Sequence, residues 1–319
     1  MDVATGVMDV AEVAARVREN IQKVIVGKTE VINLTLVAVL CEGHILFEDV
    51  PGIGKTTLAK ALARSLGCSF RRIQFTPDLL PSDVTGISYF NQKTQEFEFR
   101  PGPIMAQVVL ADEINRATPR TQSALLEAMQ ERQVTVDLDT WPLPRPFIVL
   151  ATQNPIELEG TFPLPEAQID RFLMRLAIGY PSVEEEDAML LRFERSDPLE
   201  TLQPVTDAEQ ILALQRQVRT VRVEASVRRY IVSIARATRG YEGITLGVSP
   251  RGTLALYHTA QAWAALQGRE FVIPDDVKFL APYVLTHRVL IDPQARLRGR
   301  QPHELMADIV DTVPVPVEQ

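Results

Sequence analysis

The sequence predicts an α/β domain with a parallel sheet, followed by a smaller domain made only of helices. The apolar run at 44–47 leads through a glycine-containing loop into a helical pattern at 58–64. Two more apolar runs, at 108–111 and 147–151, end in polar residues, and continuous apolar character is typical of strands buried on both faces. Beyond Asp207 the chain shows only helical patterns.

Composition excludes several classes of function. The 319 residues are 46% hydrophobic, which is enough for a sizeable core, and the net charge of −8 leaves no basic surplus for nucleic acid as the main partner. Cys41 and Cys68 lack the spacing of metal ligands or of a disulfide framework. The N-terminal segment lacks the pattern of a signal peptide, and the longest apolar run, 34–41, is too short to cross a bilayer. We therefore expect a cytoplasmic protein that does not insert into a membrane.

The stretch 48–58 has the pattern of a phosphate-binding loop. A strand, a tight glycine-containing loop and a helix start together direct backbone N–H groups at a polyphosphate. Lys55 would bring a positive charge to the β- and γ-phosphates, and Thr56 would offer its hydroxyl to Mg²⁺. The alternative is a turn that only caps a helix. The predicted nucleotide contacts are Pro51, Gly52, Ile53, Gly54, Lys55, Thr56 and Thr57.

One position departs from the usual form of this loop. Asp49 stands where the pattern has its first glycine. Gly52 lies inside the loop instead, so the backbone can still turn tightly and approach a ligand. The sequence gives no physical reason for a carboxylate so close to a polyphosphate.

Two helices are expected before the loop. Apolar residues spaced by three and four predict the first over Val10–Val24, with Asp9 as the residue that caps its start. The second is predicted over Glu30–Cys41. The segment between them either packs against the base of a nucleotide or is a plain connector, and its candidate base contacts are Val26 and Gly27.

Two acids follow the apolar run at 108–111. Ligands of parallel sheets gather at the carboxyl ends of the strands, where Asp112 would hold the hydration shell of Mg²⁺. Glu113 would orient or deprotonate an attacking water. The alternative is an acidic helix N-terminus, which the helix dipole favours in any case. With a phosphate loop upstream, the two acids predict a hydrolytic site.

Three further residues are candidates for phosphate contacts. Asn154 follows a buried strand, where its amide would hold the γ-phosphate or the water; the alternative is an Asn-Pro turn. Arg171 is suited to reach the γ-phosphate of a neighbouring subunit, because its planar fork matches phosphate oxygens; the alternative is an Asp–Arg pair that supports the fold. Arg175 is a second candidate for that role. Arg251 begins a helix, against the helix dipole, which favours an anionic partner over a solvated arginine.

Two β-hairpins are expected inside the first domain. One pairs Ile87–Phe90 with Phe97–Arg100, and the other pairs Val134–Val136 with Trp141–Leu143. A helix is expected to resume at Ile104–Gln107 after the first hairpin.

We place the first domain at residues 1–200 and the second at 201–319, with a proline-containing linker at 196–204 between them. Pro282 is expected to break or kink the last of the predicted helices of the second domain. These helices are Asp207–Val218, Ser226–Arg239, Thr253–Gln267 and Pro274–Val289.

Together these motifs resemble those of the AAA+ ATPases, and specifically the MoxR family. The resemblance covers most of the chain. It rests on Glu48–Thr57 (EDVPGIGKTT), Gln74–Gly86 (QFTPDLLPSDVTG), Phe97–Ile104 (FEFRPGPI), Val109–Ala117 (VLADEINRA), Ala151–Pro155 (ATQNP), Gly160–Phe172 (GTFPLPEAQIDRF) and Gly247–Arg251 (GVSPR).

The resemblance implies a P-loop AAA+ αβα core with a parallel sheet and β-hairpin inserts, followed by an all-α lid domain. It implies that Asn154 is the sensor-1 residue, Arg171 the arginine finger and Arg251 the sensor-2 residue, and that an acid at Asp49 is common in the family. It also implies ATP and Mg²⁺ as ligands and a homo-oligomer in the form of a hexameric ring. The partner would be a client protein complex, often with a von Willebrand factor A domain protein.

The resulting hypothesis is an ATPase that drives chaperone-like remodelling, maturation or activation of partner complexes. Two alternatives from other classes remain open at this point. A metal-chelatase motor subunit shares the first hairpin insert, and a nucleic-acid-dependent motor belongs to the same superclass. The acidic net charge disfavours the nucleic-acid motor. A small-molecule kinase is weaker, because the paired acids and the lid arginine favour hydrolysis.

Overall fold

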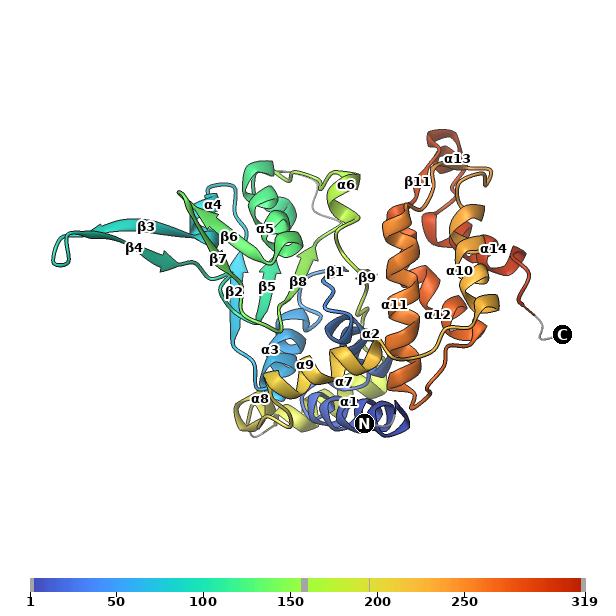
Figure 1. Ribbon diagram of the computed structural model, residues 1–319, viewed down its shortest axis with the longest axis horizontal. Helices are drawn as coiled ribbons and strands as arrows, with labels where there is room; N and C mark the ends of the chain where they lie inside the picture. The colour runs from blue at the N-terminus through green and yellow to red at the C-terminus, as the bar shows by residue number, and fades with distance from the viewer. Residues whose placement is uncertain (1–2, 156–159, 195, 317–319) are drawn as a thin grey trace.

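The computed structural model describes residues 3–155, 160–194 and 196–316. Its centre is a five-stranded sheet of order β2-β5-β8-β1-β9, in which every neighbouring pair is parallel (Figure 1). The phosphate loop follows β1, next to the middle of the sheet. The strands are β1 (Ile45–Glu48), β2 (Phe70–Gln74), β5 (Val108–Asp112), β8 (Ile148–Gln153) and β9 (Met174–Leu176).

The sheet divides the buried side chains into two clusters because successive residues of a strand point to opposite faces. In β5, Val108 and Leu110 belong to one cluster, while Val109 and Ala111 belong to the other. The same alternation holds in β8 and β1. This explains the continuous apolar runs in the sequence, since both faces of each strand are covered.

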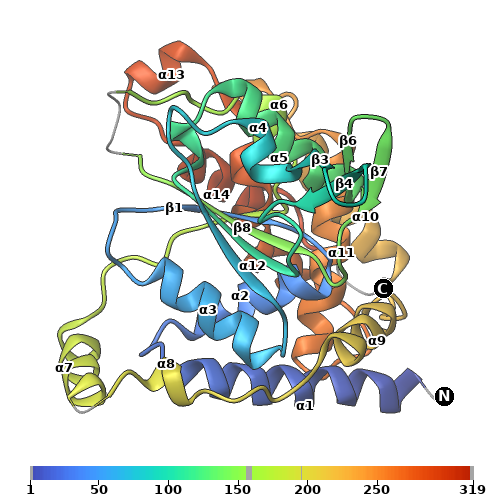
Figure 2. The ribbon, with the colours of Figure 1, turned by 90° about the vertical axis from the view of Figure 1, so that its left-hand side faces the viewer.

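Helices cover both faces of the sheet (Figure 2). The first cluster includes side chains of α1 (Val3–Gln22), α2 (Thr29–Leu40) and α3 (Lys55–Ser65). The second includes side chains of α5 (Pro119–Glu131). Three short helices complete this half: α4 (Pro81–Thr85), the 3₁₀ turn η1 (Ile114–Arg116) and α6 (Glu166–Ile169).

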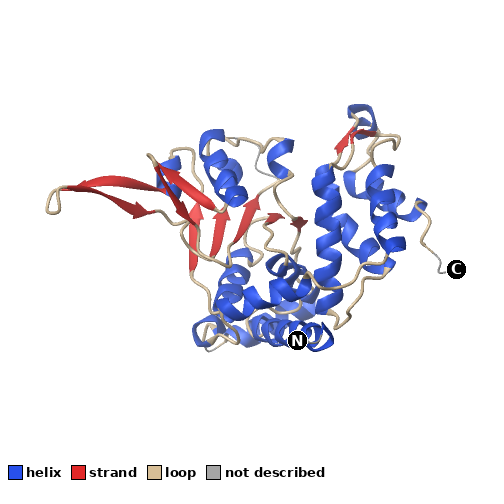
Figure 3. Ribbon diagram, in the orientation of Figure 1, coloured by secondary structure: helices blue, strands red, loops and turns tan. Residues whose placement is uncertain are grey.

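Both predicted hairpins are confirmed. β3 (Gly86–Asn91) pairs with β4 (Glu96–Pro101), and β6 (Gln133–Val136) pairs with β7 (Asp139–Pro142), each antiparallel. The β3–β4 hairpin extends away from the body of the molecule (Figures 1 and 3). The helix expected at Ile104–Gln107 is wrong, because these residues form turns and the Ile104 amide bonds to the Val84 carbonyl.

The chain reaches the lid through α7 (Val183–Phe193), α8 (Pro198–Thr201) and α9 (Ala208–Val218). Buried side chains of α9 and of the lid join the same cluster as α1 and α2, so the lid is docked by continuous apolar contact. The lid consists of α10 (Ala225–Ala237), α11 (Pro250–Leu266), α12 (Pro274–Leu285), the 3₁₀ turn η2 (Thr286–Arg288), α13 (Pro293–Leu297), α14 (Pro302–Thr312) and the two-stranded ribbon β10 (Ile244–Leu246)–β11 (Leu290–Ile291).

Several predicted boundaries were wrong. The first helix begins at Val3, so Asp9 lies within it and does not cap it. α12 runs through Pro282 and ends at Leu285, where η2 takes over. The sequence patterns also missed α13, α14 and the β10–β11 ribbon, which are short elements that depend on contacts within the lid. Within the described residues, no helix combines the length and the apolar character that a membrane span requires.

His44 links the sheet to α5 as a buried, neutral side chain. Its Nδ1 accepts a hydrogen bond from the Val149 amide at 3.0 Å, and its Nε2 donates to the Met129 carbonyl at 3.1 Å. Because Nδ1 faces a donor, it cannot carry a proton without breaking this bond. Burial lowers the pKa of His44 to about 4. His44 therefore has a structural role.

We predict that His44 makes the protein less stable as the pH falls. The unfolded chain takes up a proton near pH 6.5, whereas the folded protein does so only near pH 4. Acidification between these values favours unfolding and should cost about 3 kcal/mol of the free energy of unfolding. Urea unfolding at several pH values checks this. His44→Asn should flatten the pH dependence, and an equally steep loss in the variant would contradict the assignment.

Candidate active site

The phosphate loop connects β1 to the first turn of α3. Gly52 and Gly54 have φ values of +86° and +92°, a region that side chains with a Cβ rarely adopt. A Cβ at either position would meet no atom within 4 Å, so the backbone conformation, and not crowding, requires glycine. The loop leaves the N-terminus of α3 open, where backbone N–H groups and the helix dipole favour an anion.

Lys55 is held inside this loop. Its Nζ donates to the carbonyls of Asp49 and Val50 at 2.8 and 3.0 Å. Burial lowers the pKa of Lys55, and the nearby carboxylates of Asp49, Asp112 and Glu113 oppose that shift. The ammonium group therefore lies near three acids and is hydrogen-bonded to two carbonyls. A phosphate can take the place of these carbonyls as its partner.

Asp49 has a structural role that the sequence did not reveal. Its Oδ1 accepts a hydrogen bond from the Val50 amide at 2.9 Å, and its Oδ2 accepts one from the Gly179 amide at 2.7 Å. The carboxylate faces two backbone donors and fixes the start of the phosphate loop against the segment after β9. A glycine in this place would provide no such link.

The two acids at the end of β5 are fixed by neighbouring strands. Thr152 on β8 donates to Asp112 Oδ1 at 2.6 Å and accepts the Glu113 amide at 2.8 Å. Arg72 on β2 donates to Asp112 Oδ2 at 2.6 and 3.0 Å. Glu113 has a φ of +57°, an uncommon conformation for a residue other than glycine, and its Oε2 accepts a bond from Gln74 at 2.8 Å.

These groups meet in one polar cavity of about 360 Å³. Asn154, at the carboxyl end of β8, lies in it together with the loop and the acids. The oxygens of Thr56 and Asp112 are the hard ligands that Mg²⁺ prefers, so the donor set fits this ion. The lining residues are Pro51, Gly52, Gly54, Lys55, Thr56, Thr57, Arg72, Asp112, Glu113, Thr152 and Asn154.

Sequence reasoning missed Arg72, Gln74 and Thr152. A signal for the first two was present, because alternate residues of a strand share a face and both belong to the same predicted strand. Their partners could not be inferred, because they depend on the strand order β2-β5-β8, and no local sequence pattern determines which strands are neighbours.

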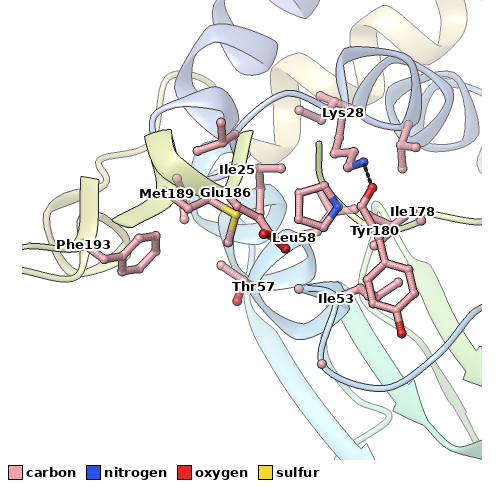
Figure 4. Close-up of a pocket in the computed structure, with 18 of the residues that line it drawn as sticks. Ile25, Lys28, Ile53, Thr57, Leu58, Ile178, Tyr180, Glu186, Met189 and Phe193 are labelled. Carbon is pink, nitrogen blue, oxygen red and sulfur yellow. Dashed lines mark hydrogen bonds between the residues drawn. The ribbon is translucent and has the colours of Figure 1, made fainter. Parts of the chain in front are cut away.

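A larger, mostly apolar cavity of about 550 Å³ adjoins the polar one, and the two share Pro51, Gly52, Gly54 and Thr57. Ile25, Ile53 and Met189 come from three different elements and surround it (Figure 4). Its size suits the base and ribose of a nucleotide. The lining residues are Val24, Ile25, Val26, Lys28, Val31, Ile32, Pro51, Gly52, Ile53, Gly54, Thr57, Leu58, Ile178, Gly179, Tyr180, Pro181, Glu186, Met189, Leu190 and Phe193.

The segment between α1 and α2 thus forms a wall of this cavity and is more than a connector. Val26 lines the cavity. Gly27 lies behind it with a φ of +65°, and a Cβ there would fall 1.8 Å from Glu185 Oε1 on α7. Glycine therefore allows α7 to approach. Lys28 donates to the Tyr180 carbonyl at 2.8 Å on the far side of the cavity (Figure 4). It also pairs with Glu185 at 3.3 Å.

Arg171 and Arg251 lie outside both cavities. The anion beside Arg251 is Asp170, whose Oδ2 is 3.8 Å from Arg251 Nη1, so Arg251 of the lid pairs with the residue that precedes Arg171 in the chain. Among the described residues Arg171 has no carboxylate partner, whereas Arg175 pairs with Glu48 at 3.0 Å. Of the two arginine-finger candidates, Arg171 is thus the one without an acidic partner.

Comparison with known proteins gives consistent matches. Residues 44–174 match the ATPase family associated with various cellular activities (AAA), and residues 236–309 match the AAA lid domain. The chain is 56% identical to the protein YeaC of Bacillus subtilis over 94% of both chains. It is 40% identical to the chaperone MoxR1 of Mycobacterium tuberculosis, over 93% of this chain and 80% of that one.

A solved structure agrees with the fold as well. The crystal structure of a candidate ATPase from Cytophaga hutchinsonii superimposes with a TM-score of 0.92 at 37% identity, over 98% of each chain. Sheet order, phosphate loop, lid and relatives all agree, and the chain belongs to the MoxR family of AAA+ ATPases.

Proposed function

We propose that this chain binds ATP across the two adjoining cavities and hydrolyses it with the help of Mg²⁺. The observation that supports this most strongly is the junction of the cavities: the apolar one opens onto the phosphate loop, and the loop faces Asp112 and Glu113. A base in the first cavity would place the phosphates against the acids in the second. A site that only binds a nucleotide for regulation would not need a carboxylate such as Glu113 next to the γ-phosphate.

Five side chains of the polar cavity have proposed roles in this reaction. Lys55 exchanges its carbonyl partners for phosphate oxygens, and the loop amides stabilise the charge that develops there. Glu113 orients the attacking water and takes its proton, and Asn154 fixes the water or the γ-phosphate by hydrogen bonds. Mg²⁺ held near Thr56 and Asp112 would neutralise charge on the β- and γ-phosphates.

We further infer that the site is completed by a neighbouring copy. Arg251 pairs with Asp170, which precedes Arg171 in the chain, and neither arginine lines a cavity of its own chain, so the phosphate they serve would belong to the next protomer. A contact in which one surface of a protomer meets a different surface of the next closes into a ring when the rotation permits. A hexameric ring is the assembly that we propose.

The work of the ring would be remodelling of a client protein complex, with a von Willebrand factor A domain protein as a candidate partner. The extended β3–β4 hairpin supports this, because it presents Phe90 and Phe97 to solvent. Leu138, between β6 and β7, is 98% exposed. Exposed apolar side chains that gather on protruding hairpins are typical of protein interaction sites.

Two substitutions test the chemistry. Lys55→Ala should abolish nucleotide binding, because the phosphates lose their cation. Glu113→Gln should bind ATP as tightly as the wild type but lower the turnover by at least about 10³-fold, as expected for loss of the group that activates water. A fluorescent nucleotide measures binding, and phosphate release without an added acceptor measures turnover. Normal turnover by Glu113→Gln would rule it out as the base.

Mixed assemblies test the neighbour. Arg171→Ala subunits keep an intact cavity, and Glu113→Gln subunits keep an intact Arg171, so each is inactive alone. Mixing them should restore hydrolysis at the contacts where an intact cavity meets an intact arginine, a gain that can reach about 10³-fold or more. If activity stays at the level of the unmixed variants, Arg171 does not act on a neighbour.

A trap variant tests the client role. Glu113→Gln should retain a partner protein in ATP but not in ADP, which co-purification and mass spectrometry measure. Adding Phe97→Ser, at a side chain that is 75% exposed on the hairpin, should release that partner. Adding Leu297→Ser, at an 88% exposed side chain of the lid, is the matched control and should not. Equal retention in both double variants would contradict a role for the hairpin.

A further inference from the structure

Arg288 of the lid makes a buried contact with the core. Its side chain is 2% exposed and lies in η2, at the end of α12. Its Nη1 donates to the carbonyl of Asp170 at 2.8 Å and to the Asp170 carboxylate at 2.5 Å. Its Nη2 donates to the carbonyl of Phe172 at 2.7 Å and more weakly to that of Leu173 at 3.4 Å.

All five N–H donors of this guanidinium are engaged, since Nε donates to the Val284 carbonyl at 2.8 Å. The neighbouring His287 donates from its Nε2 to the Phe172 carbonyl at 3.1 Å. The carbonyls that Arg288 binds stand on both sides of Arg171 in the chain. A single side chain of the lid therefore binds the backbone on both sides of Arg171.

We propose that Arg288 is a positioning residue for Arg171. Its hydrogen bonds to residues 170–173 fix the backbone there, so the lid determines where Arg171 lies relative to a neighbouring protomer. The proposal rests on the proposed role of Arg171 in a neighbour's site. Asp170 pairs with both Arg288 and Arg251, so this contact bears on the positions of Arg171 and Arg251 together.

Because of these hydrogen bonds, the lid and residues 170–173 are expected to move together. Separating them would leave a buried cation and three backbone carbonyls without partners, which is costly in a site that excludes water. Any shift of the lid is therefore passed to Arg171. Lysine cannot replace this contact, because an ammonium has three donors on a single atom and cannot span several carbonyls in one plane.

The test uses the mixture of Arg171→Ala and Glu113→Gln subunits, in which the Glu113→Gln subunit provides the arginine. Arg288→Lys is added to the provider only. The provider subunit carries Glu113→Gln and does not hydrolyse ATP itself. Any effect of Arg288→Lys on turnover must therefore arise at the active site of the neighbouring subunit. We expect the rescued turnover to fall by about tenfold to a hundredfold, the usual effect of a small misplacement of a catalytic group. The nucleotide KM of the acceptor should stay unchanged.

Arg269→Lys in the provider is the matched control. Arg269 also pairs with a buried acid of the lid, Asp276, at 2.5 Å, but it does not touch residues 170–173. It should leave the rescue intact. Asp170→Asn is a milder second variant: it removes the charge but keeps the backbone carbonyls, and it should lower the rescue less than Arg288→Lys. Mass measurement of the assemblies and nucleotide binding establish that each provider is folded.

Hydrogen exchange gives a readout that does not depend on activity. The amides of Arg171, Phe172 and Leu173 are hydrogen-bonded to the carbonyls of Gln168, Ile169 and His44. Arg288→Lys should speed exchange in the peptide that contains them, and Arg269→Lys should not. Unchanged exchange, or faster exchange with full rescue, would overturn the proposal.

The remaining outcomes are also decisive. If Arg288→Lys does not assemble, full rescue by the Asp170→Asn provider would refute the positioning role. If the parent mixture shows no rescue before Arg288 is changed, the action of Arg171 on a neighbour fails and this proposal fails with it. The two failures are distinguished by the step at which rescue is lost.

Discussion

The pairing of β9 with β1 is the interaction on which the rest of the site depends. Only three residues of each strand are in register, from Ile45 opposite Met174 to Phe47 opposite Leu176. The chain before β9 carries Arg171, and the chain after it forms part of the apolar cavity and meets Asp49. This short strand therefore sets the distance between the phosphate loop and Arg171, the proposed arginine finger.

Several polar contacts hold this segment in place, and they are spread along its length. Arg288 binds its beginning, Arg175 pairs with Glu48 at the strand, and the Gly179 amide binds Asp49 at its end. The lid shares the apolar cluster of α1 and α2, so it is not attached by a linker alone. We therefore expect nucleotide-dependent motion between protomers more than within one, since moving the lid alone would expose part of a continuous core.

The parts of the fold that repeat a local pattern were predictable from the sequence. Strands buried on both faces, the loop with its two acids and both hairpins follow from periodicity and turn residues. What could not be predicted were pairings between distant segments. The role of Asp49 depends on its bond to Gly179, which is 130 residues away in the chain. The role of Arg72 depends on the position of β2 beside β5. The position of Arg251 beside Asp170, away from its own phosphate loop, likewise depends on how the lid docks.

The helix α7 has a kinetic consequence. It covers the apolar cavity with Met189 and Leu190, yet none of its residues, all of which the structure describes, is buried. Its polar links to the N-terminal helices include the Lys28–Glu185 ion pair, which is partly exposed, and a hydrogen bond from Arg192 to the Gln22 carbonyl. At the proposed nucleotide site, a bound nucleoside would leave by displacement of this one surface helix, while the sheet and the lid stay in place. Because salt screens the ion pair, exchange of product for substrate would be faster at high ionic strength.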